Sequence, residues 1–286
     1  MKVVLFYGGF GTRLREYSDT IPKSMVSIGP RPIIWHLMKY YAHYGHTEFI
    51  LCLGYRGDLI KEYFLNYDEC VSNDFTLSDG GKTVHVHHRD IDDWKITFAE
   101  TGLHSNLGQR LLAAEKYVGT DDVFLANYSD GLTDLSLPAY LEHFRSHDKV
   151  ASFLCVRPAH SFHVVSLGNG GDVLDLRDAT ESDLWINGGF FAFKHRIFEY
   201  IKDGEELVCE PFQRLIRDNE LVAYQYTGFW ACMDTFKDKQ RFEDMTSRGD
   251  TPWQVWKSGA TNTAAYGGLR AVPSHELRVP RGGRGA

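Results

Sequence analysis

A glycine-rich loop near the start of the chain has the composition of a phosphate-binding loop. It follows a short apolar run and reads Tyr7-Gly8-Gly9-Phe10-Gly11-Thr12-Arg13-Leu14. Glycines leave backbone N–H groups open to phosphate oxygens, and Arg13 and Lys23 would add positive charge. The spacing matches neither a Walker A loop nor GxGxxG. A turn that merely closes the strand would also explain the glycines.

Two aspartates follow apolar runs and could hold a metal ion. Asp130 comes shortly after the run at 122–127, and Asp234 comes directly after Met233. Carboxylates at strand ends suit Mg²⁺, which offsets the charge that builds up when one phosphate attacks another. The alternative is structural, with Asp130 beginning a turn and Asp234 capping a helix that starts near Thr235.

The apolar pattern predicts an α/β fold that would position these residues. The expected strands cover 3–7, 48–53 and 122–127, and the expected helices cover 33–41, with Gly45 as the stop, and 58–66. Strands that alternate with helices indicate a parallel sheet, which binds ligands at the carboxyl ends of its strands. Gly8 and Ser129 would both lie at that edge, so their loops should share one cleft.

Two segments break the alternation of strands and helices. Residues 83–88 alternate in polarity, which predicts a β excursion with one face in water. Residues 164–177 carry glycines between two apolar runs, as a β-hairpin does, and could form a lid or an acceptor subsite. We do not expect His85, His87 and His88 to bind a metal, because successive residues of a strand, such as His87 and His88, face opposite sides.

Composition restricts the class of protein. The chain has 286 residues, 43% of them hydrophobic, and can bury a large core as one enlarged domain or two small ones. Its formal charge of -7 argues against binding nucleic acid through diffuse basic charge. No apolar run approaches the roughly 18 residues of a membrane span. The five cysteines, odd in number and without a CxxC pair, predict reduced, buried thiols in a cytoplasmic protein.

Taken together, the motifs resemble those of the sugar-1-phosphate nucleotidyltransferases, and the closest branch is glucose-1-phosphate cytidylyltransferase. The likeness covers about residues 2 to 257 and includes the glycine-rich loop, Pro22-Lys23-x-Met25, Pro32-Ile33-Ile34-Trp35-His36, Ser129-Asp130-Gly131, Ile186-Asn187-Gly188-Gly189-Phe190-Phe191 and Met233-Asp234-Thr235. It implies a Rossmann-like mixed, mostly parallel sheet flanked by helices, with a small β excursion. We expect one nucleotidyltransferase domain over 1–258 and a disordered tail that contains glycine and arginine over 259–286.

The resemblance also implies roles for individual residues. The triphosphate would be held by Gly8, Gly9, Gly11, Thr12 and Arg13, with Arg13 and Lys23 as catalytic cations. The nucleotide would be recognised with Gly108 and Arg110, Mg²⁺ held by Asp130 and Asp234, and the sugar phosphate bound by Asn187, Gly188 and Arg177. The partners implied are CTP or another NTP and a sugar 1-phosphate, in a homo-oligomer.

The chain departs from the family in the base and sugar regions. Arg177 stands near the place of a lysine in the family's Glu-Lys-Pro segment, and it is not an equivalent group. Gln109, Tyr7 and Ser24 replace Gly, Ala and Pro of the family pattern. The favoured reaction joins CTP to glucose 1-phosphate, giving CDP-glucose and pyrophosphate. Another NTP, a modified sugar or cyclitol phosphate, or a regulatory paralogue that binds nucleotide sugars without turnover remain open.

Overall fold

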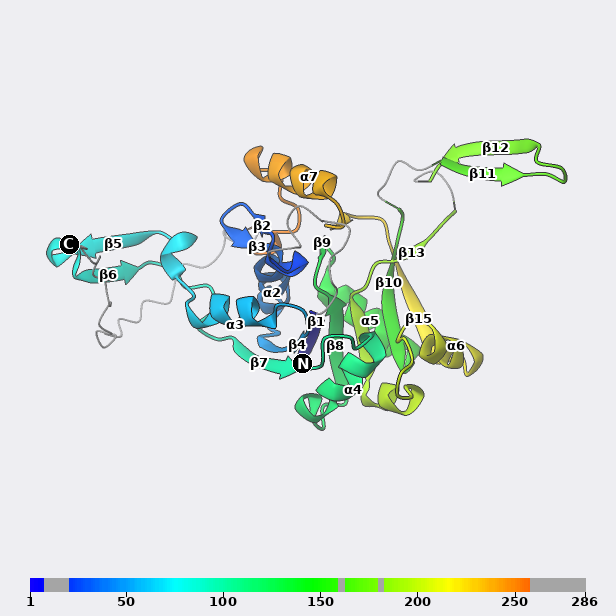
Figure 1. Cartoon of the computed structure of the whole chain (residues 1–286), viewed down its shortest axis with the longest axis horizontal. Helices are drawn as coiled ribbons and strands as arrows, with labels where there is room; N and C mark the ends of the chain where they lie inside the picture. Colours follow the sequence, from blue (N-terminus) through cyan, green and yellow to red (C-terminus); the bar gives the residue numbers. More distant parts are fainter. Residues whose placement is uncertain (8–20, 159–162, 180–182, 258–286) are drawn as a thin grey trace, which may run out of the picture.

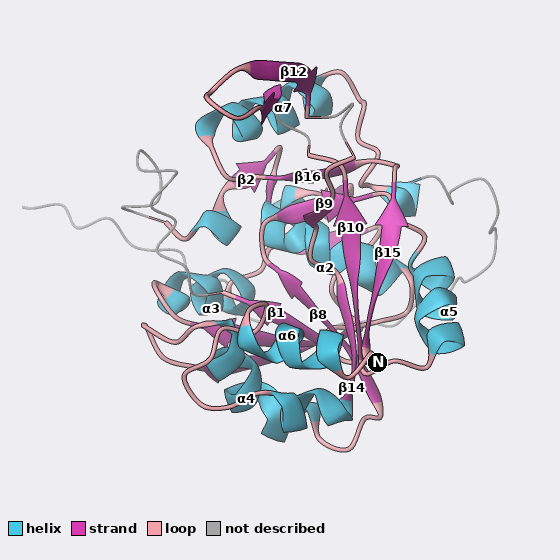
Figure 2. Cartoon of the chain, turned by 90° about the vertical axis from the view of Figure 1, so that its right-hand side faces the viewer, coloured by secondary structure: helices cyan, strands magenta, loops and turns pink. Residues whose placement is uncertain are grey.

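The computed structural model of the chain describes residues 1–7, 21–158, 163–179 and 183–257. Its centre is a mixed sheet flanked by helices on both faces (Figures 1 and 2). The sheet consists of β1 (Val3–Phe6), β4 (Glu48–Leu53), β7 (Lys95–Glu100), β8 (Val123–Tyr128), β10 (Ala151–Val156), β13 (Ile186–Asn187), β14 (Phe191–Lys194) and β15 (Leu221–Tyr226). The expected Rossmann-like architecture is confirmed. The tail expected at 259–286 lies outside the described residues.

Most neighbouring strands of the sheet are parallel. β8, β1, β4 and β7 pair in parallel in that order, and β10 pairs in parallel with β15. β13 and β14 both pair in antiparallel fashion with β10, and β14 also pairs in antiparallel fashion with β8. In the register of β1, Phe6 lies beside both Cys52 and Tyr128. Tyr7 and Ser129 therefore follow at the same carboxyl edge, as the sequence predicts for their two loops.

The helices cover the two faces of the sheet as separate layers. The layers contain α2 (Ile33–His43), α3 (Gly57–Leu65), α4 (Leu107–Val118), α5 (Leu137–His147) and α6 (Glu210–Arg217), whereas α7 (Phe236–Ser247) packs against β2 (Ser27–Ile28), outside the main sheet. Successive side chains of β1 point to opposite faces of the sheet. Val3 and Leu5 therefore pack with α2 and α5 on one face, and Val4 and Phe6 pack with α4 on the other. The sheet is thus buried on both sides, which explains why its central strands read as continuous apolar runs.

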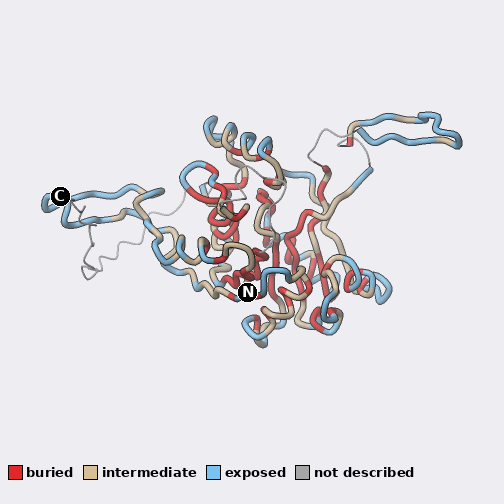
Figure 3. Tube along the Cα trace, viewed as in Figure 1, coloured by how far each residue is buried: buried red, intermediate tan, exposed pale blue. Residues whose placement is uncertain are grey.

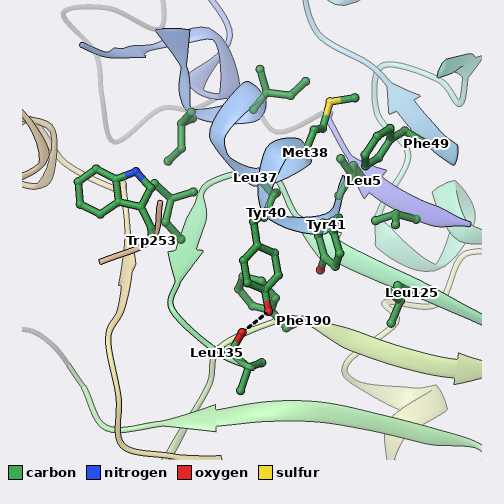
Figure 4. Packing of buried hydrophobic residues seen from close by; sticks show 14 of the residues in the cluster. Leu5, Leu37, Met38, Tyr40, Tyr41, Phe49, Leu125, Leu135, Phe190 and Trp253 are labelled. Atoms are coloured by element: carbon green, nitrogen blue, oxygen red, sulfur yellow. Dashed lines mark hydrogen bonds between the residues drawn. The ribbon is translucent and has the colours of Figure 1, made fainter. Parts of the chain in front are cut away.

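Helix α2 lies at the centre of one layer. Eight of its eleven residues are buried, and Gly45 follows it in the left-handed conformation with φ of 81°, as the predicted stop requires. Figure 4 shows Tyr40 and Tyr41 pointing from this helix toward Phe190. The hydroxyl of Tyr40 donates to the carbonyl of Leu135 at 2.9 Å, which satisfies a polar group in the core.

Two hairpins lie outside the main sheet, at opposite ends of the long axis in Figure 1. They pair β5 (Phe75–Ser78) with β6 (Thr83–Val86), and β11 (His163–Leu167) with β12 (Val173–Asp178). The predicted excursion and the predicted hairpin are confirmed. The expectation of a single wet face for the first hairpin is wrong, because Leu77 and Val84 on its apolar face are also exposed (Figure 3). No described element covers that face.

His36 on α2 makes the stability of the fold dependent on pH. Its side chain is buried, with Nε2 at 3.0 Å from the carbonyl oxygen of Ile28, and burial lowers its pKa from 6.5 to about 4. Between these values the unfolded chain binds a proton that the native state does not bind. The contribution of His36 to the free energy of unfolding is therefore fully present above pH 6.5 and is lost as the pH falls toward 4.

We expect His36 to reduce the free energy of unfolding by about 2 kcal/mol between pH 7 and pH 5, from about 1.5 pH units at 1.36 kcal/mol each. Urea unfolding at the two pH values measures the change in wild type and in His36→Gln, which retains a hydrogen-bond donor. The variant should lose less stability on acidification. Equal losses in the two proteins would contradict the prediction.

Candidate active site

Three side chains from distant parts of the sequence converge at the carboxyl edge of the sheet. The Lys23 Nζ atom lies 2.5 Å from Asp130 Oδ2 and 2.5 Å from Asp234 Oδ1. The three side chains are between 17% and 32% exposed, so the charges are partly screened from water but remain accessible to a ligand. The structure therefore brings together three of the residues that the resemblance assigns to the reaction.

A two-stranded ladder positions the two aspartates. β9 (Gly131–Thr133) pairs in antiparallel fashion with β16 (Trp230–Cys232), so that Gly131 lies opposite Cys232. The ladder continues one step further, where the N–H of Met233 donates to the carbonyl of Asp130 at 2.9 Å. Asp130 directly precedes β9 and Asp234 follows β16 by two residues, so this end of the ladder holds the two carboxylates close to each other.

The start of α7 leaves the carboxylate of Asp234 free of a capping role. The N-cap is Thr235, in a capping box with Asp238, so the alternative role of Asp234 as the cap is wrong. Asp238 also accepts from the backbone N–H of Asp234 at 3.1 Å. The helix thus fixes the backbone of Asp234, while the side chain of Asp234 points to Lys23.

The local charges keep Lys23 protonated. Burial acts to lower the pKa of its ammonium, but Asp130 and Asp234 outweigh that effect and the pKa is raised. The second carboxylate oxygen of Asp234, Oδ2, accepts a hydrogen bond from the thiol of Cys232 at 3.3 Å. Burial, followed by the charges of both aspartates, raises the pKa of this thiol, which is therefore a neutral donor.

The other cysteines lie outside this cluster. All five are free, in agreement with the predicted reduced thiols. The expectation that they are buried is wrong for Cys209, which is exposed, and holds fully for Cys52 alone. The hydrogen bond from Cys232 to Asp234 was missed, because a cysteine beside an apolar run carries no sequence signal for such a contact.

The donor set fits a magnesium ion that substrate phosphates complete. Two carboxylates converge on one point that already accommodates a positive charge, the ammonium of Lys23. Within the described ranges, no group of three or more His, Cys, Asp or Glu side chains forms a metal cage. Mg²⁺ commonly binds through one or two carboxylates together with substrate phosphates and water, so two are sufficient.

The glycine-rich loop is described only at its first residue. Gly8, Gly9, Gly11, Thr12 and Arg13 lie outside the described residues, and their predicted contacts with the triphosphate stay predictions. Tyr7 continues β1, since its N–H donates to the carbonyl of Cys52 at 2.9 Å. Burial, and after it Cys52 and Asp130, raises the pKa of the Tyr7 phenol. The chain therefore enters the loop close to the carboxylate of Asp130.

Asn187 and Gly188 lie beside the strands that carry the aspartates. Asn187 Nδ2 donates to the hydroxyl of Tyr128 at 3.2 Å, and Trp230 Nε1 donates to the carbonyl of Gly188 at 2.9 Å. These contacts join the segment to the end of β8 and to β16. Tyr128 and Trp230 were missed as positioning residues, although Tyr128 directly precedes the motif Ser129-Asp130-Gly131 and Trp230 lies three residues before Met233-Asp234-Thr235. The predicted contact of Asn187 and Gly188 with the sugar stays a prediction.

Gly108 and Arg110 lie in the first turn of α4, beneath the same edge of the sheet. Arg110 is 3% exposed, and its NH1 donates to the carbonyl of Leu53 at 3.1 Å and to Thr101 Oγ1 at 2.7 Å. Its guanidinium therefore ties α4 to the ends of β4 and β7. The predicted role of both residues in recognising the nucleotide stays a prediction.

Gly108→Ala is expected to destabilise the fold by about 2 kcal/mol through overpacking. A Cβ atom at this position would lie 2.2 Å from the carbonyl oxygen of Glu205, which is backbone and cannot rotate away. Gly131→Ala is the matched control, since the nearest atom to its added Cβ is 3.7 Å away. Urea unfolding should show a clearly smaller loss for the control, and equal losses would contradict the packing argument.

Arg177 is not placed with the other predicted site residues. It lies on β12 of the projecting hairpin (Figure 1), and its Nε atom is 2.5 Å from Asp175 Oδ2. Its side chain is 61% exposed. No described contact joins it to Lys23, Asp130 or Asn187, and its predicted contact with the sugar phosphate stays a prediction.

Comparison with known proteins identifies the family. The sequence profile described as nucleotidyl transferase matches residues 2–238. The glucose-1-phosphate cytidylyltransferase of Salmonella typhimurium is 38% identical over 259 residues, which cover 90% of this chain and 100% of the relative. A probable glucose-1-phosphate cytidylyltransferase of Bacillus subtilis is 38% identical over 258 residues, with the same two coverages.

Solved structures agree on the fold. A putative glucose-1-phosphate thymidylyltransferase from Bacillus anthracis matches with a TM-score of 0.61 at 17% identity, covering 86% of this chain and 94% of that one. A UDP-glucose pyrophosphorylase in complex with UDP-glucose matches with a TM-score of 0.63 at 14% identity, covering 87% and 98%. None of the described helices has the length and apolar character that a membrane span requires. The chain belongs to the nucleotidyl transferase family, in the group of sugar-1-phosphate nucleotidyltransferases that its glucose-1-phosphate cytidylyltransferase relatives represent.

Proposed function

We propose that this enzyme transfers the cytidylyl group of CTP to glucose 1-phosphate, giving CDP-glucose and pyrophosphate. The choice of substrates follows the relatives that are 38% identical over 90% of the chain. The observation that carries the reaction type is the convergence of Lys23, Asp130 and Asp234 at the carboxyl edge of the sheet. Such an edge is where open α/β sheets bind their ligands.

The chemistry is an in-line displacement at phosphorus. A nonbridging oxygen of the sugar phosphate attacks the α-phosphorus of CTP, a new P–O bond forms, and the bond to the bridging oxygen of the β-phosphate breaks. Pyrophosphate leaves with the electron pair of that bond, and no covalent enzyme intermediate is needed. The enzyme contributes mainly by positioning and by electrostatic stabilisation.

Lys23 and the two aspartates would have different electrostatic roles in the reaction. Asp130 and Asp234 would hold Mg²⁺, which when bound orients the phosphates of the two substrates and offsets their charge. Lys23, kept protonated by its two carboxylate neighbours, would offset the charge on the departing pyrophosphate. Arg13 would act with it. Asn187, whose amide donates to the hydroxyl of Tyr128, would orient the sugar.

Release of pyrophosphate across a panel of substrates tests this assignment. CTP, UTP, dTTP, ATP and GTP are each combined with glucose 1-phosphate, other sugar 1-phosphates and a cyclitol phosphate, in the presence of Mg²⁺. CTP with glucose 1-phosphate should give the highest kcat/KM. A different best pair would replace the proposed substrates. Thermal stabilisation by nucleotide sugars without release of pyrophosphate from any pair would indicate a regulatory binding protein instead.

We also infer that the enzyme acts in the cytoplasm, as the reduced cysteines suggest. Assembly of several copies, which the family resemblance implies, is part of the same proposal. The absence of a nucleic-acid partner, argued from the negative formal charge, stays a prediction.

A further inference from the structure

The carboxyl end of β10 lies at the edge of the sheet that holds the candidate active site. β10 runs antiparallel to β14, and β14 runs antiparallel to β8, so β10 and β8 point the same way. The chain therefore leaves β10 after Val156 at the same edge where it leaves β8 after Tyr128. Arg157 is the first residue beyond β10, and it lies at the edge where open α/β sheets bind their ligands.

The register between β10 and β13 sets Arg157 opposite Trp185. The two strands pair in antiparallel fashion up to Val156, which lies opposite Ile186, and the next step of this ladder brings Arg157 to Trp185. Pro158 favours extended backbone at the residue before it, so the direction of β10 continues through Arg157. The side chains agree with this register, because Arg157 Cζ lies 4.3 Å from the centre of the Trp185 ring.

Asn187 is the diagonal neighbour of Arg157 across this ladder. Alternate residues along a strand point to one side, which puts Trp185 and Asn187 on the same face. Diagonal neighbours in an antiparallel pair are about 7–8 Å apart, within reach of a long side chain. Asn187 donates in turn to the hydroxyl of Tyr128, two residues before Asp130. A connected row of side chains thus leads from Arg157 toward the aspartates.

Trp185 holds the guanidinium of Arg157 without cancelling its charge. The electron-rich face of an indole attracts a stacked guanidinium, while the N–H groups of the guanidinium point outward from its rim. Asp183 Oδ1 lies 3.7 Å from the NH2 atom of Arg157, but the Asp183 side chain is fully exposed, and such a pair contributes little. The Arg157 side chain is 33% exposed, so a ligand in solution can reach it.

The phosphate of a sugar 1-phosphate needs a cation of this kind. A phosphate monoester carries about 1.5 to 2 negative charges at pH 7. Lys23 lies between Asp130 and Asp234, so its charge is already shared by two carboxylates. Arg177 is 61% exposed on the projecting β11–β12 hairpin. Arg157 instead carries its charge at the carboxyl edge of the sheet, beside the residue expected to meet the sugar.

We propose that Arg157 binds the phosphate group of the sugar 1-phosphate, and that Trp185 is the positioning residue that holds its guanidinium. A planar guanidinium donates two parallel N–H groups to two phosphate oxygens, which fixes the orientation of the phosphate as well as its place. Asn187 would meet the sugar ring of the same molecule. The inference rests on the proposed function and names the residue that captures its acceptor substrate.

Steady-state kinetics of pyrophosphate release, with each substrate varied in turn, tests the role of Arg157 on the full chain. Arg157→Met should raise KM for glucose 1-phosphate by about 10- to 100-fold, the scale of a lost hydrogen bond to a charged group. KM for CTP should stay at the wild-type value. Arg157→Lys keeps the charge without the planar fork and should give an intermediate KM. The matched control is Arg196→Met, since Arg196 is an exposed arginine that follows β14 at the opposite edge of the sheet.

The role of Trp185 is tested through its dependence on Arg157. Trp185→Leu removes the ring under the guanidinium and should raise KM for glucose 1-phosphate, while Trp185→Phe retains a ring and should recover most of the loss. Added to Arg157→Met, Trp185→Leu should have no further effect, because two residues that act through one contact are not additive. A purely structural role for Trp185 would instead lower activity equally in the presence and absence of Arg157.

Three results would overturn the proposal: an unchanged KM for glucose 1-phosphate in Arg157→Met, an equal rise in KM for both substrates, or a larger rise in Arg177→Met, which would assign the phosphate to Arg177. Circular dichroism verifies that each variant is folded. If Arg157→Met unfolds, Arg157→Lys decides the question, and a wild-type KM in that variant would contradict the proposal. If the substrate panel selects another sugar phosphate, the same variants are measured with it. A wild type that releases no pyrophosphate from any pair would remove the proposed function and this role of Arg157 with it.

Discussion

Replacing Asp234 with alanine is expected to lower kcat for pyrophosphate release by about 10³-fold, the scale on which loss of one preorganised electrostatic group acts. The carboxylate lies 2.5 Å from Lys23 Nζ and is one of the two proposed ligands of Mg²⁺. Asp130→Ala should have an effect of similar size, because Asp130 is the other carboxylate. Initial rates at saturating CTP, glucose 1-phosphate and Mg²⁺ measure the loss.

The control for this experiment is Asp148→Asn, because Asp148 has a φ of 51°, which asparagine tolerates better than alanine. Asp148 is an exposed aspartate that also pairs with a lysine, Lys194, but it lies on the surface after α5. Its variant should keep wild-type turnover. All three proteins should show similar urea midpoints, since the backbone of Asp234 is fixed through Asp238 rather than through its own carboxylate. Full activity of either purified site variant would remove the metal assignment.

Lys23→Met is expected to lower kcat/KM by about 10²-fold, with the larger part in kcat. Methionine fills a similar volume but supplies no charge for the departing pyrophosphate. Its loss also leaves the two carboxylates without their shared cation, so Mg²⁺ should bind more tightly to the variant in the absence of nucleotide. Calorimetric titration with Mg²⁺ measures that second effect independently of turnover.

Lys194→Met is the matched control for Lys23→Met, since Lys194 also pairs with an aspartate but lies away from the site. It should leave both kcat/KM and Mg²⁺ affinity at wild-type values. An unchanged kcat in Lys23→Met would show that this ammonium does not act on the reacting phosphates. Lys23→Arg separates charge from shape, and it should recover only part of the activity because a guanidinium is larger and flat.

The sequence pattern was sufficient for the elements with strong local signals. β1, β4 and β8 are apolar runs because the sheet covers them on both faces, and α2 has its helical period and a glycine stop. β10, β14 and β15 of the main sheet were not foreseen, and neither was β7. β7 lies at the edge of the sheet, where Lys95 and Glu100 are exposed, so its pattern lacks a continuous apolar run.

The candidate site was predictable in its residues and not in its geometry. The motifs around Lys23, Asp130 and Asp234 identify the three side chains, but their meeting depends on the ladder between β9 and β16, two strands of three residues each. Such short strands, about a hundred residues apart in the sequence, carry no local signal. The same limit applies to Arg110, whose buried hydrogen bonds to Leu53 and Thr101 could not be read from its place in a helix.

The most direct measurement is phosphorus NMR of wild-type enzyme with CTP, glucose 1-phosphate and Mg²⁺, run beside Asp234→Ala. The account predicts that wild type converts the signals of CTP and the sugar phosphate, one for one, into pyrophosphate and a new diphosphate with two inequivalent phosphorus atoms, while Asp234→Ala leaves the spectrum unchanged. Wild type that forms CDP and inorganic phosphate, or Asp234→Ala that forms the product at the wild-type rate, would contradict nucleotidyl transfer at the Lys23, Asp130 and Asp234 cluster.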